Sequence, residues 1–299
     1  MTKNKKSERL FLIAIVFSMC IWGFSWSSAK ILSGYGSASS IAFIRFVIVM
    51  FSLLGLIITF KIDFKIKRSG LLYVIAAGFF LLIYSLLFFS GLQLGKPGAG
   101  GVLVTTTNPI FAYLIGLIIS RVLPKKMEIV GLIIGVFAGS VLLNVWSEGR
   151  EGLFDLGNSL FLISALTWAI MSKFSSQSHR FGHSVTFIFW MHVFTVIGFT
   201  LFTDLNEVSQ ILQTGDTKFW LNMIYFGTIN STLATTCYLY AASKLGAEKA
   251  SSFIYLVPSA ALFGSWLFLG EEVLLHTVIG GVLGVLAVFI INKKSEKIV

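Results

Sequence analysis

Arg45 is the side chain with the clearest capacity for chemistry, because it is the one permanently charged residue that lies well inside a long apolar run. A charge at the centre of a membrane helix costs roughly 2.5–3.5 kcal/mol on insertion scales, so such residues usually serve a function. A guanidinium binds carboxylates and phosphates through paired hydrogen bonds. Arg45 is therefore a candidate anchor for an anionic group. The alternative is a structural arginine that reaches towards the membrane surface or bonds helix-end carbonyls.

Aromatic and amide side chains inside the apolar runs form a second set of candidates. Tryptophan and tyrosine usually gather at the ends of membrane helices, and a buried one needs a partner for its N–H or O–H group. A wet cavity would supply that partner, whereas packing between helices is the alternative for each residue. Together with Arg45, the predicted substrate-binding residues are Trp22, Trp26, Tyr84, Asn108, Trp168, Trp190, Asn230 and Tyr255.

Other kinds of chemistry find no support in the sequence. It contains no HExxH, GxSxG, P-loop or GxGxxG pattern, so it does not indicate an enzyme. Two cysteines are too few for a disulfide framework or a soft metal site, and we expect neither a metal nor a cofactor. All 13 acidic residues fall outside the centres of the apolar runs. Exchange of lipophilic cations for protons is disfavoured, because it requires a buried carboxylate.

The elements that would position these residues are membrane helices. The chain has 299 residues, of which 56% are hydrophobic and 12% charged, whereas soluble proteins carry roughly 25% charged residues. Apolar runs of about 20 residues, each long enough to cross about 30 Å of hydrocarbon as a helix, recur throughout. We predict an all-α polytopic membrane protein with ten transmembrane helices, at 10–29, 38–60, 70–91, 97–119, 127–146, 154–173, 184–203, 218–240, 248–269 and 273–292.

The basic residues predict the orientation of these helices. If the N-terminus lies in the cytoplasm, most of the 23 lysines and arginines fall in the tails and in the loops on the cytoplasmic side. This distribution follows the positive-inside rule and predicts that both tails, 1–9 and 293–299, are cytoplasmic. The net charge of +10 is thus explained by topology, and no nucleic-acid partner is expected.

Part of the chain occurs twice. Leu94-Gly95 leads into Pro109, and Leu245-Gly246 leads into Pro258, each within a matched apolar run. Five predicted spans precede the segment around residue 150 and five follow it, and an odd number per repeat forces the halves to face opposite ways. The chain is therefore predicted to be a 5+5 inverted repeat, with halves at 10–146 and 154–292. Interrupted helices at matched places are typical of transport sites.

Pro109 and Pro258 are predicted hinges. A proline has no N–H group, so the carbonyls of Thr105 and Ile254 lose their helical partners. Two alternatives are open for these helices: they line a cavity, or they are simply kinked and packed against their neighbours. Glycines at four-residue spacing in spans 5 and 10 could pack these helices together or form a dimer face, so a monomer and a homodimer both stay open.

The second half resembles a known family. The resemblance rests, in the second half, on the segments Gly227 to Ala241, Leu245 to Ser251, Tyr255 to Pro258, Leu269 to Glu272 and Ile279 to Gly281. In the first half it rests on Trp22 to Ser25, Lys30 and Arg45-Phe46. These motifs are similar to the EamA family of the drug/metabolite transporter superfamily. The resemblance implies a ten-helix 5+5 carrier of small metabolites in the plasma membrane, here the inner membrane of a bacterium, with 10–146 and 154–292 as the two EamA repeats. The sequence departs from the family at Ser120-Arg121, where the first half lacks Gly-Glu, and at Val257, where an acidic residue often stands.

Two functions fit these observations. The leading hypothesis is a secondary active transporter that exports small polar metabolites such as amino acids by alternating access. The alternative is an exchanger of organic anions, nucleotide sugars or phosphorylated metabolites, with Arg45 as the anion anchor. In both cases the partners are a small solute and the lipid bilayer.

Overall fold

The computed structural model describes residues 2–142, 144, 155–246, 250 and 252–292, with the side chains of 2–12, 252, 255, 288, 291 and 292 left aside. Helices dominate this part of the chain, and it contains no strand beyond an isolated bridge between Ile66 and Gly182. The α-helices are α1 (Thr2–Ser33), α2 (Ala38–Thr59), α3 (Leu71–Leu94), α4 (Pro97–Ser120), α5 (Lys126–Leu142), α7 (Leu156–Ser175), α8 (Ser184–Thr200), α9 (Leu205–Thr214), α10 (Thr217–Ile224), α11 (Thr235–Leu245), α13 (Val257–Leu269) and α14 (Leu275–Asn292). Short helical segments are η1 (Arg68–Gly70), η2 (Ser178–Arg180), the π-helix η3 (Tyr225–Ala234) and η4 (Ser252–Leu256).

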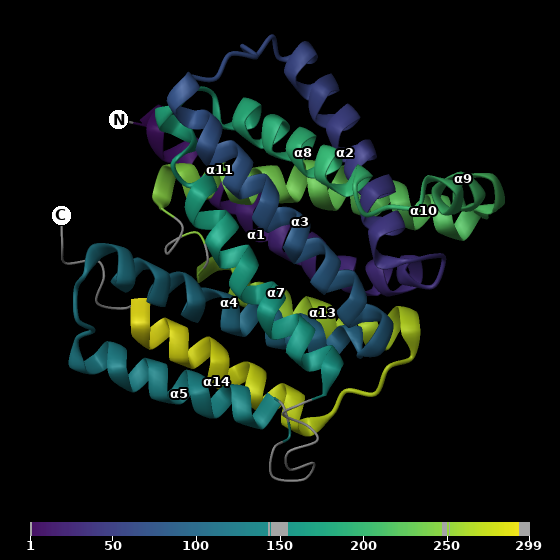
Figure 1. Cartoon of the computed structure of the whole chain (residues 1–299). Coiled ribbons are helices and arrows are strands. Elements are labelled where there is room, and N and C mark those ends of the chain that lie inside the picture. The colour runs from purple at the N-terminus through teal and green to yellow at the C-terminus, as the bar shows by residue number, and fades with distance from the viewer. Residues whose placement is uncertain (1, 143, 145–154, 247–249, 251, 293–299) are drawn as a thin grey trace.

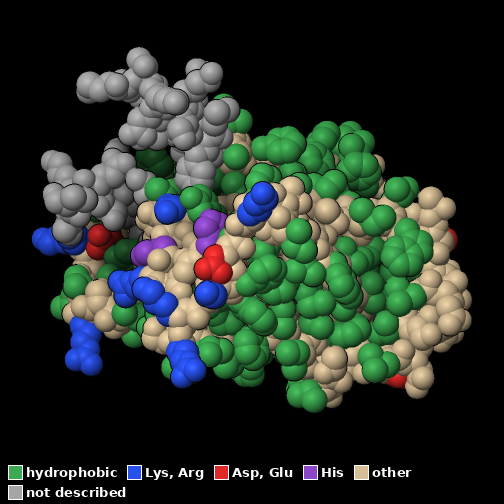
Figure 2. All heavy atoms as spheres, turned by 90° about the horizontal axis from the view of Figure 1, so that it is seen from above, with side chains coloured by type: hydrophobic (Ala, Val, Ile, Leu, Met, Phe, Trp, Pro, Cys, Tyr) green, Lys and Arg blue, Asp and Glu red, His purple; other side chains and the backbone are tan. Residues whose placement is uncertain are grey.

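The outer surface is that of a membrane protein. Large apolar side chains are exposed on many helices, for example Phe51 on α2, Ile118 on α4 and Leu286 on α14. Figure 2 shows a broad hydrophobic surface, with lysine and arginine side chains gathered at one end of the molecule. A soluble monomer rarely exposes contiguous apolar patches above a few hundred Å². The prediction of an all-α membrane protein is therefore confirmed.

The count of ten crossings stays a prediction. Within the described residues, five segments are long and apolar enough to span a bilayer: 13–33, 38–59, 68–94, 97–120 and 156–180. Helices α8 and α9 form a further pair bent by 108°, and Val257–Leu269 and Leu275–Ala287 are shorter apolar helices. The predicted span 218–240 is divided among α10, η3 and α11, and the span 248–269 falls on η4 and α13.

Packing between helices follows the two-fold repeat. Helix α1 packs against α13, and α7 packs against α4, which are equivalent contacts when the halves are exchanged. Small residues bring these helices close: a Cβ at Gly23 of α1 would lie 2.3 Å from Cβ of Ala260 in α13. Helices α5 and α14 lie side by side at one edge of the molecule (Figure 1), with Gly280 against Leu142. Gly135, Gly280 and Gly284 therefore serve packing inside the chain, whereas a Cβ at Gly139 would meet nothing within 4 Å. The oligomeric state of the protein stays open.

The two proline helices differ. Helix α4 continues through Pro109, and the hydroxyls of Thr105, Thr106 and Thr107 each donate to the backbone carbonyl four residues earlier. Pro258 instead stands in the first turn of α13, directly after η4. The second proline thus marks a change of helix type, whereas the first does not. The role of both as hinges stays a prediction.

Polar contacts join the halves at the end away from the start of α1 and the end of α14 (Figure 1). Glu207 of α9 accepts hydrogen bonds from Ser37 N (2.7 Å), Ser37 Oγ (2.5 Å) and Ser40 Oγ (2.6 Å), at the N-terminus of α2. Tyr35 donates to Asp216 Oδ1 at 2.7 Å. Within the first half, the Lys30 ammonium donates to the carbonyls of Leu92 and Gly95 and so caps the C-terminus of α3.

Candidate functional site

A small cavity of about 50 Å³ lies between the two halves, which in this conformation is room for a few water molecules. Helices of both repeats contribute to its wall. The lining residues are Trp22, Ser25, Trp26, Arg45, Tyr84, Phe88, Val104, Thr105, Asn108, Trp168, Phe226, Asn230, Thr235, Ile254 and Val257. Asn108 and Val257, the residues directly before Pro109 and Pro258, both belong to it.

Most of the predicted site residues meet in this cavity. Seven of the nine line it: Trp22, Trp26, Arg45, Tyr84, Asn108, Trp168 and Asn230. Trp190 does not, because its Nε1 donates to the carbonyl of Phe64 in the connection after α2, at 3.1 Å. Its ring packs against Phe189, so for Trp190 the structure shows the packing alternative. Tyr255 lies in η4, and its side chain is outside the described residues.

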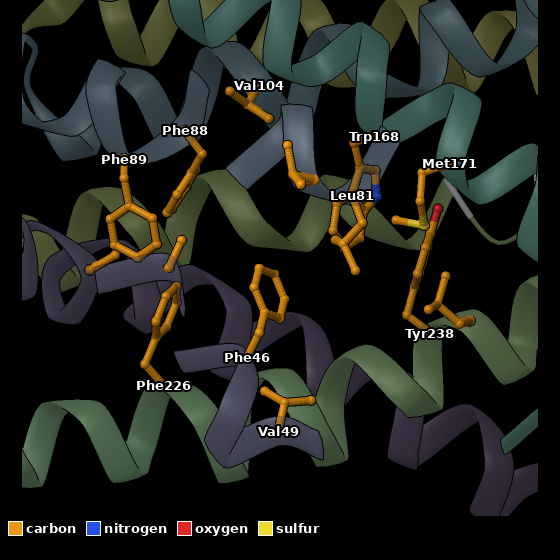
Figure 3. Packing of buried hydrophobic residues seen from close by; sticks show 14 of the residues in the cluster. Phe46, Val49, Leu81, Phe88, Phe89, Val104, Trp168, Met171, Phe226 and Tyr238 are labelled. Carbon is orange, nitrogen blue, oxygen red and sulfur yellow. The ribbon is translucent and has the colours of Figure 1, made fainter. Parts of the chain in front are cut away.

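Arg45 is held from three sides. Its side chain is 4% exposed, and its Nε donates to Ser231 Oγ at 2.9 Å. Its Cζ lies 4.2 Å from the ring centre of Phe226 and 4.8 Å from that of Phe46, which are cation–π distances. Figure 3 shows these two rings in the same cluster as Phe88 and Trp168. Arg45 therefore points into the protein and does not reach the membrane surface.

Four buried polar atoms of the cavity residues have no hydrogen-bonding partner among the described residues. They are the donors Arg45 Nη1 and Trp168 Nε1 and the acceptors Asn108 Oδ1 and Asn230 Oδ1. The orientation of the Asn108 amide follows from its Nδ2, which donates to the carbonyl of Ala165 at 3.0 Å. A buried polar atom without a partner costs about 1–3 kcal/mol, so the four around this cavity call for water or for a polar ligand.

Aromatic rings form the apolar part of the wall. Trp22 and Trp168 meet edge to face at 5.3 Å between ring centres, and Tyr84 lies 4.7 Å from Trp168. Trp22 Nε1 donates to Thr235 Oγ1 at 3.2 Å, which fixes that ring. The described lining residues include neither aspartate nor glutamate. The cavity thus combines aromatic surface with one guanidinium and uncharged polar groups.

Several lining residues carry no signal in the sequence. Phe88 and Phe226 are two of 29 phenylalanines in a chain that is apolar throughout. Ser231, which holds Arg45, stands in a polar run from Thr228 to Thr236 within an apolar segment. That run is a signal for a cavity wall, but it does not show which of its members face inwards. The π-helical geometry of η3 decides this, and nothing in the sequence predicts it.

A helical membrane protein with two repeats and a polar and aromatic cavity between them is typical of membrane transport proteins. The chain belongs to the EamA-like transporter family, whose model matches residues 9–145 and 155–293. The family expected from the motifs is therefore confirmed, and the chain is a membrane transporter.

Individual proteins match this chain only at low sequence identity. "Uncharacterized transporter YoaV" of Bacillus subtilis (strain 168) is 24% identical over 283 residues, which cover 91% of this chain and 93% of the relative. "Probable terminal-alkyne amino-acid exporter" of Streptantibioticus cattleyicolor is 31% identical over 72 residues, 24% of either chain. A protein known from a crystal structure aligns with a TM-score of 0.64 at 16% identity, over 95% of this chain and 96% of the other, and supports the fold alone.

Proposed function

We propose that this transporter is a secondary active carrier that exports small zwitterionic metabolites, such as amino acids, by alternating access. The observation that carries the proposal is the set of four unpartnered polar atoms around the cavity. Arg45 Nη1 and Trp168 Nε1 are donors suited to a carboxylate, and the Asn108 and Asn230 carbonyl oxygens are acceptors suited to an ammonium group. A zwitterion satisfies both kinds of group and brings no net charge into the site.

Other observations agree with this proposal. The Streptantibioticus cattleyicolor relative is named as an exporter of an amino acid. The sequence contains no P-loop, so uphill transport would draw on a gradient. Basic side chains gather at one end of the molecule (Figure 2), as the positive-inside rule requires for a bacterial plasma-membrane protein with cytoplasmic termini. Helix α4 and the pair η4–α13, with Pro109 and Pro258, are the segments we propose as hinges.

The second candidate is an anion exchanger in which Arg45 alone decides recognition. The buried guanidinium favours it, because among the described lining residues no carboxylate neutralises its charge. The two candidates differ in the role of the asparagine oxygens. An anion without an ammonium group would leave Asn108 Oδ1 and Asn230 Oδ1 unsatisfied, whereas a zwitterion would not.

Three matched solutes separate these functions in proteoliposome counterflow. We would compare an amino acid such as leucine with its amide, which lacks the carboxylate, and with 4-methylpentanoate, which lacks the amine; a thermal-shift screen of the other amino acids would choose the parent solute. The zwitterion should exchange at least ten times better than either analogue, since each lost charge-assisted hydrogen bond is worth about 1.5–3 kcal/mol. Equal exchange of 4-methylpentanoate would instead support the anion candidate, and equal exchange of all three would refute both.

A variant pair tests the assigned site. Arg45→Met should abolish the preference for the solute that carries a carboxylate. Arg68→Met, which removes an arginine from η1 outside the cavity lining, should leave the preference unchanged. Transport with the same preference in both variants would show that the cavity around Arg45 is not the binding site.

A further inference from the structure

The π-helix η3 gives the residues around Arg45 an unusual spacing. Successive residues of an α-helix turn by about 100°, so residues five apart point about 140° away from each other. A π-helix bonds residue i to residue i+5, which places such residues on the same face. In η3 the hydroxyls follow this pattern: Ser231 Oγ donates to the carbonyl of Phe226 (2.7 Å), and Thr232 Oγ1 to that of Gly227 (3.1 Å).

Two pairs of residues five apart use this spacing. Phe226 and Ser231 both contact the Arg45 guanidinium, one with its ring and the other with its hydroxyl oxygen. Asn230 and Thr235 both line the cavity. In an α-helical segment, Ser231 would be turned away from Arg45 whenever Phe226 faced it. The π-helix therefore builds this part of the cavity wall.

Ser231 stands in the middle of two consecutive hydrogen bonds. Arg45 Nε donates to Ser231 Oγ, and the Ser231 hydroxyl in turn donates to the carbonyl of Phe226. Because the hydroxyl proton is committed to that carbonyl, the oxygen accepts from Arg45. Nε is thereby occupied within the wall and Nη1 has no partner among the described residues. This arrangement leaves the terminal side of the guanidinium for a ligand in the cavity.

We propose that Ser231 and Phe226 are positioning residues, and that the π-helix η3 of the second repeat orients Arg45 of the first repeat towards the carboxylate of the cargo. The part that concerns the carboxylate rests on the proposed function. The part that concerns the orientation of Arg45 does not depend on the identity of the cargo. A ligand anchor assembled from both repeats links the binding site to the relative positions of α2 and η3.

The chain offers a matched pair of variants. Ser231→Ala removes the oxygen that holds Arg45. Thr232→Ala removes the neighbouring hydroxyl, which makes the same kind of bond to a carbonyl five residues earlier and has no hydrogen bond to Arg45. Both residues are 1% exposed, and Thr232→Ala removes a methyl group together with the hydroxyl, so its change in packing is the larger of the two. A purely structural role for Ser231 therefore predicts an effect at least as large from Thr232→Ala.

The first measurement is the KM for the zwitterionic solute and for its amide in proteoliposomes. Ser231→Ala should raise the KM for the zwitterion about tenfold while the KM for the amide and both kcat values change little, because a guanidinium that is no longer held in place loses the equivalent of one charge-assisted hydrogen bond to the carboxylate. Thr232→Ala should leave the ratio of the KM for the amide to the KM for the zwitterion unchanged. Equal effects of the two variants on the KM ratio would overturn the positioning role of Ser231 in recognition.

The second measurement needs no cargo. With ¹⁵N-labelled arginine, the Nε–H signal of Arg45, assigned through Arg45→Lys, should exchange with solvent slowly in the wild-type protein and in Thr232→Ala. It should exchange at least tenfold faster in Ser231→Ala, because its acceptor is gone. Equal exchange in all three proteins would overturn the proposal. A wild-type protein without preference for the carboxylate but with this exchange pattern would refute the proposed function and still support the orientation of Arg45 by η3.

Discussion

Replacing Glu207 by glutamine should loosen the contact between α9 and the connection from α1 to α2. The carboxylate accepts three hydrogen bonds from Ser37 and Ser40, and it lies at the N-terminus of α2, where a negative charge is stabilised by the helix dipole. Three fully buried bonds of this kind would sum to about 4.5–9 kcal/mol. Glu207 is only half-buried, and water competes for its oxygens, so we expect a loss of about 1–2 kcal/mol in the free energy of docking.

The pH dependence of this contact follows from the carboxylate. Hydrogen bonds from Ser37 and then Ser40 hold the pKa of Glu207 below its ordinary value. A depressed pKa means that the stabilisation is complete above the ordinary pKa of about 4.3 and is lost as the pH falls through the lower value in the folded protein. The contact should therefore be constant from about pH 5.5 to 8 and weaken only in stronger acid. In Glu207→Gln this dependence should be absent.

Hydrogen exchange followed by mass spectrometry measures the docking directly. A loss of 1–2 kcal/mol corresponds to opening that is about 5–30 times more frequent, so peptides that cover 34–41 and 205–214 should exchange faster by that factor in Glu207→Gln. Gln213→Ala is the control, because Gln213 donates a hydrogen bond to Ser209 within α9 and has none to α2 among the described residues. Unchanged exchange in Glu207→Gln at neutral pH, or the same increase in the control, would refute the assignment.

Three further predictions concern single side chains. Trp168→Phe keeps an aromatic ring in the cavity but removes the unpartnered Nε1 donor, so the KM in flux assays should rise about three- to tenfold with an unchanged melting temperature; an unchanged KM would exclude this donor from binding. Lys30→Met removes the ammonium from the C-terminal carbonyls of α3 and should lower the free energy of unfolding by about 1–2 kcal/mol, visible as a lower melting temperature; equal melting temperatures would contradict the capping role. Gly23→Val should destabilise the α1–α13 contact by about 1–3 kcal/mol, because the new Cβ meets Ala260, and Ala260→Gly should restore part of the loss; a double variant no more stable than Gly23→Val would argue against this clash.

The membrane fold and seven of the 15 cavity residues could be predicted from the sequence, because polar or charged groups stand out against apolar runs. A chain of high hydropathy reveals its spans, and one guanidinium among apolar residues is conspicuous, as Arg45 is. Trp190 shows the limit of this reasoning. A tryptophan inside an apolar span looks the same whether its N–H faces a cavity or the Phe64 carbonyl. Lipid is as apolar as the protein core, so the amphipathic pattern that would assign faces is weak.

Local backbone geometry was less accessible to sequence reasoning. The matched prolines predicted matched helices, yet the helix around Pro109 is continuous and the one at Pro258 follows η4. The three threonine hydroxyls before Pro109 bond the carbonyls one turn earlier, and the second half has no such run. The sequence does not predict the π-helix either, because it differs from an α-helix only in that each backbone hydrogen bond reaches one residue further along the chain. These differences depend on which tertiary contacts are available, and spacing along the chain does not report them.

The tryptophans have a consequence for observing the protein at work. Trp22, Trp26 and Trp168 line the cavity, whereas Trp266 of α13 is 54% exposed on the apolar outer surface. Fluorescence from the cavity should respond to cargo and to soluble quenchers that enter with it, while Trp266 should respond to brominated lipid. The two environments are therefore separable by the choice of quencher once Trp146, Trp190 and Trp220 are replaced by phenylalanine. The transporter contains its own optical reporter of occupancy, together with an internal reference that faces the bilayer.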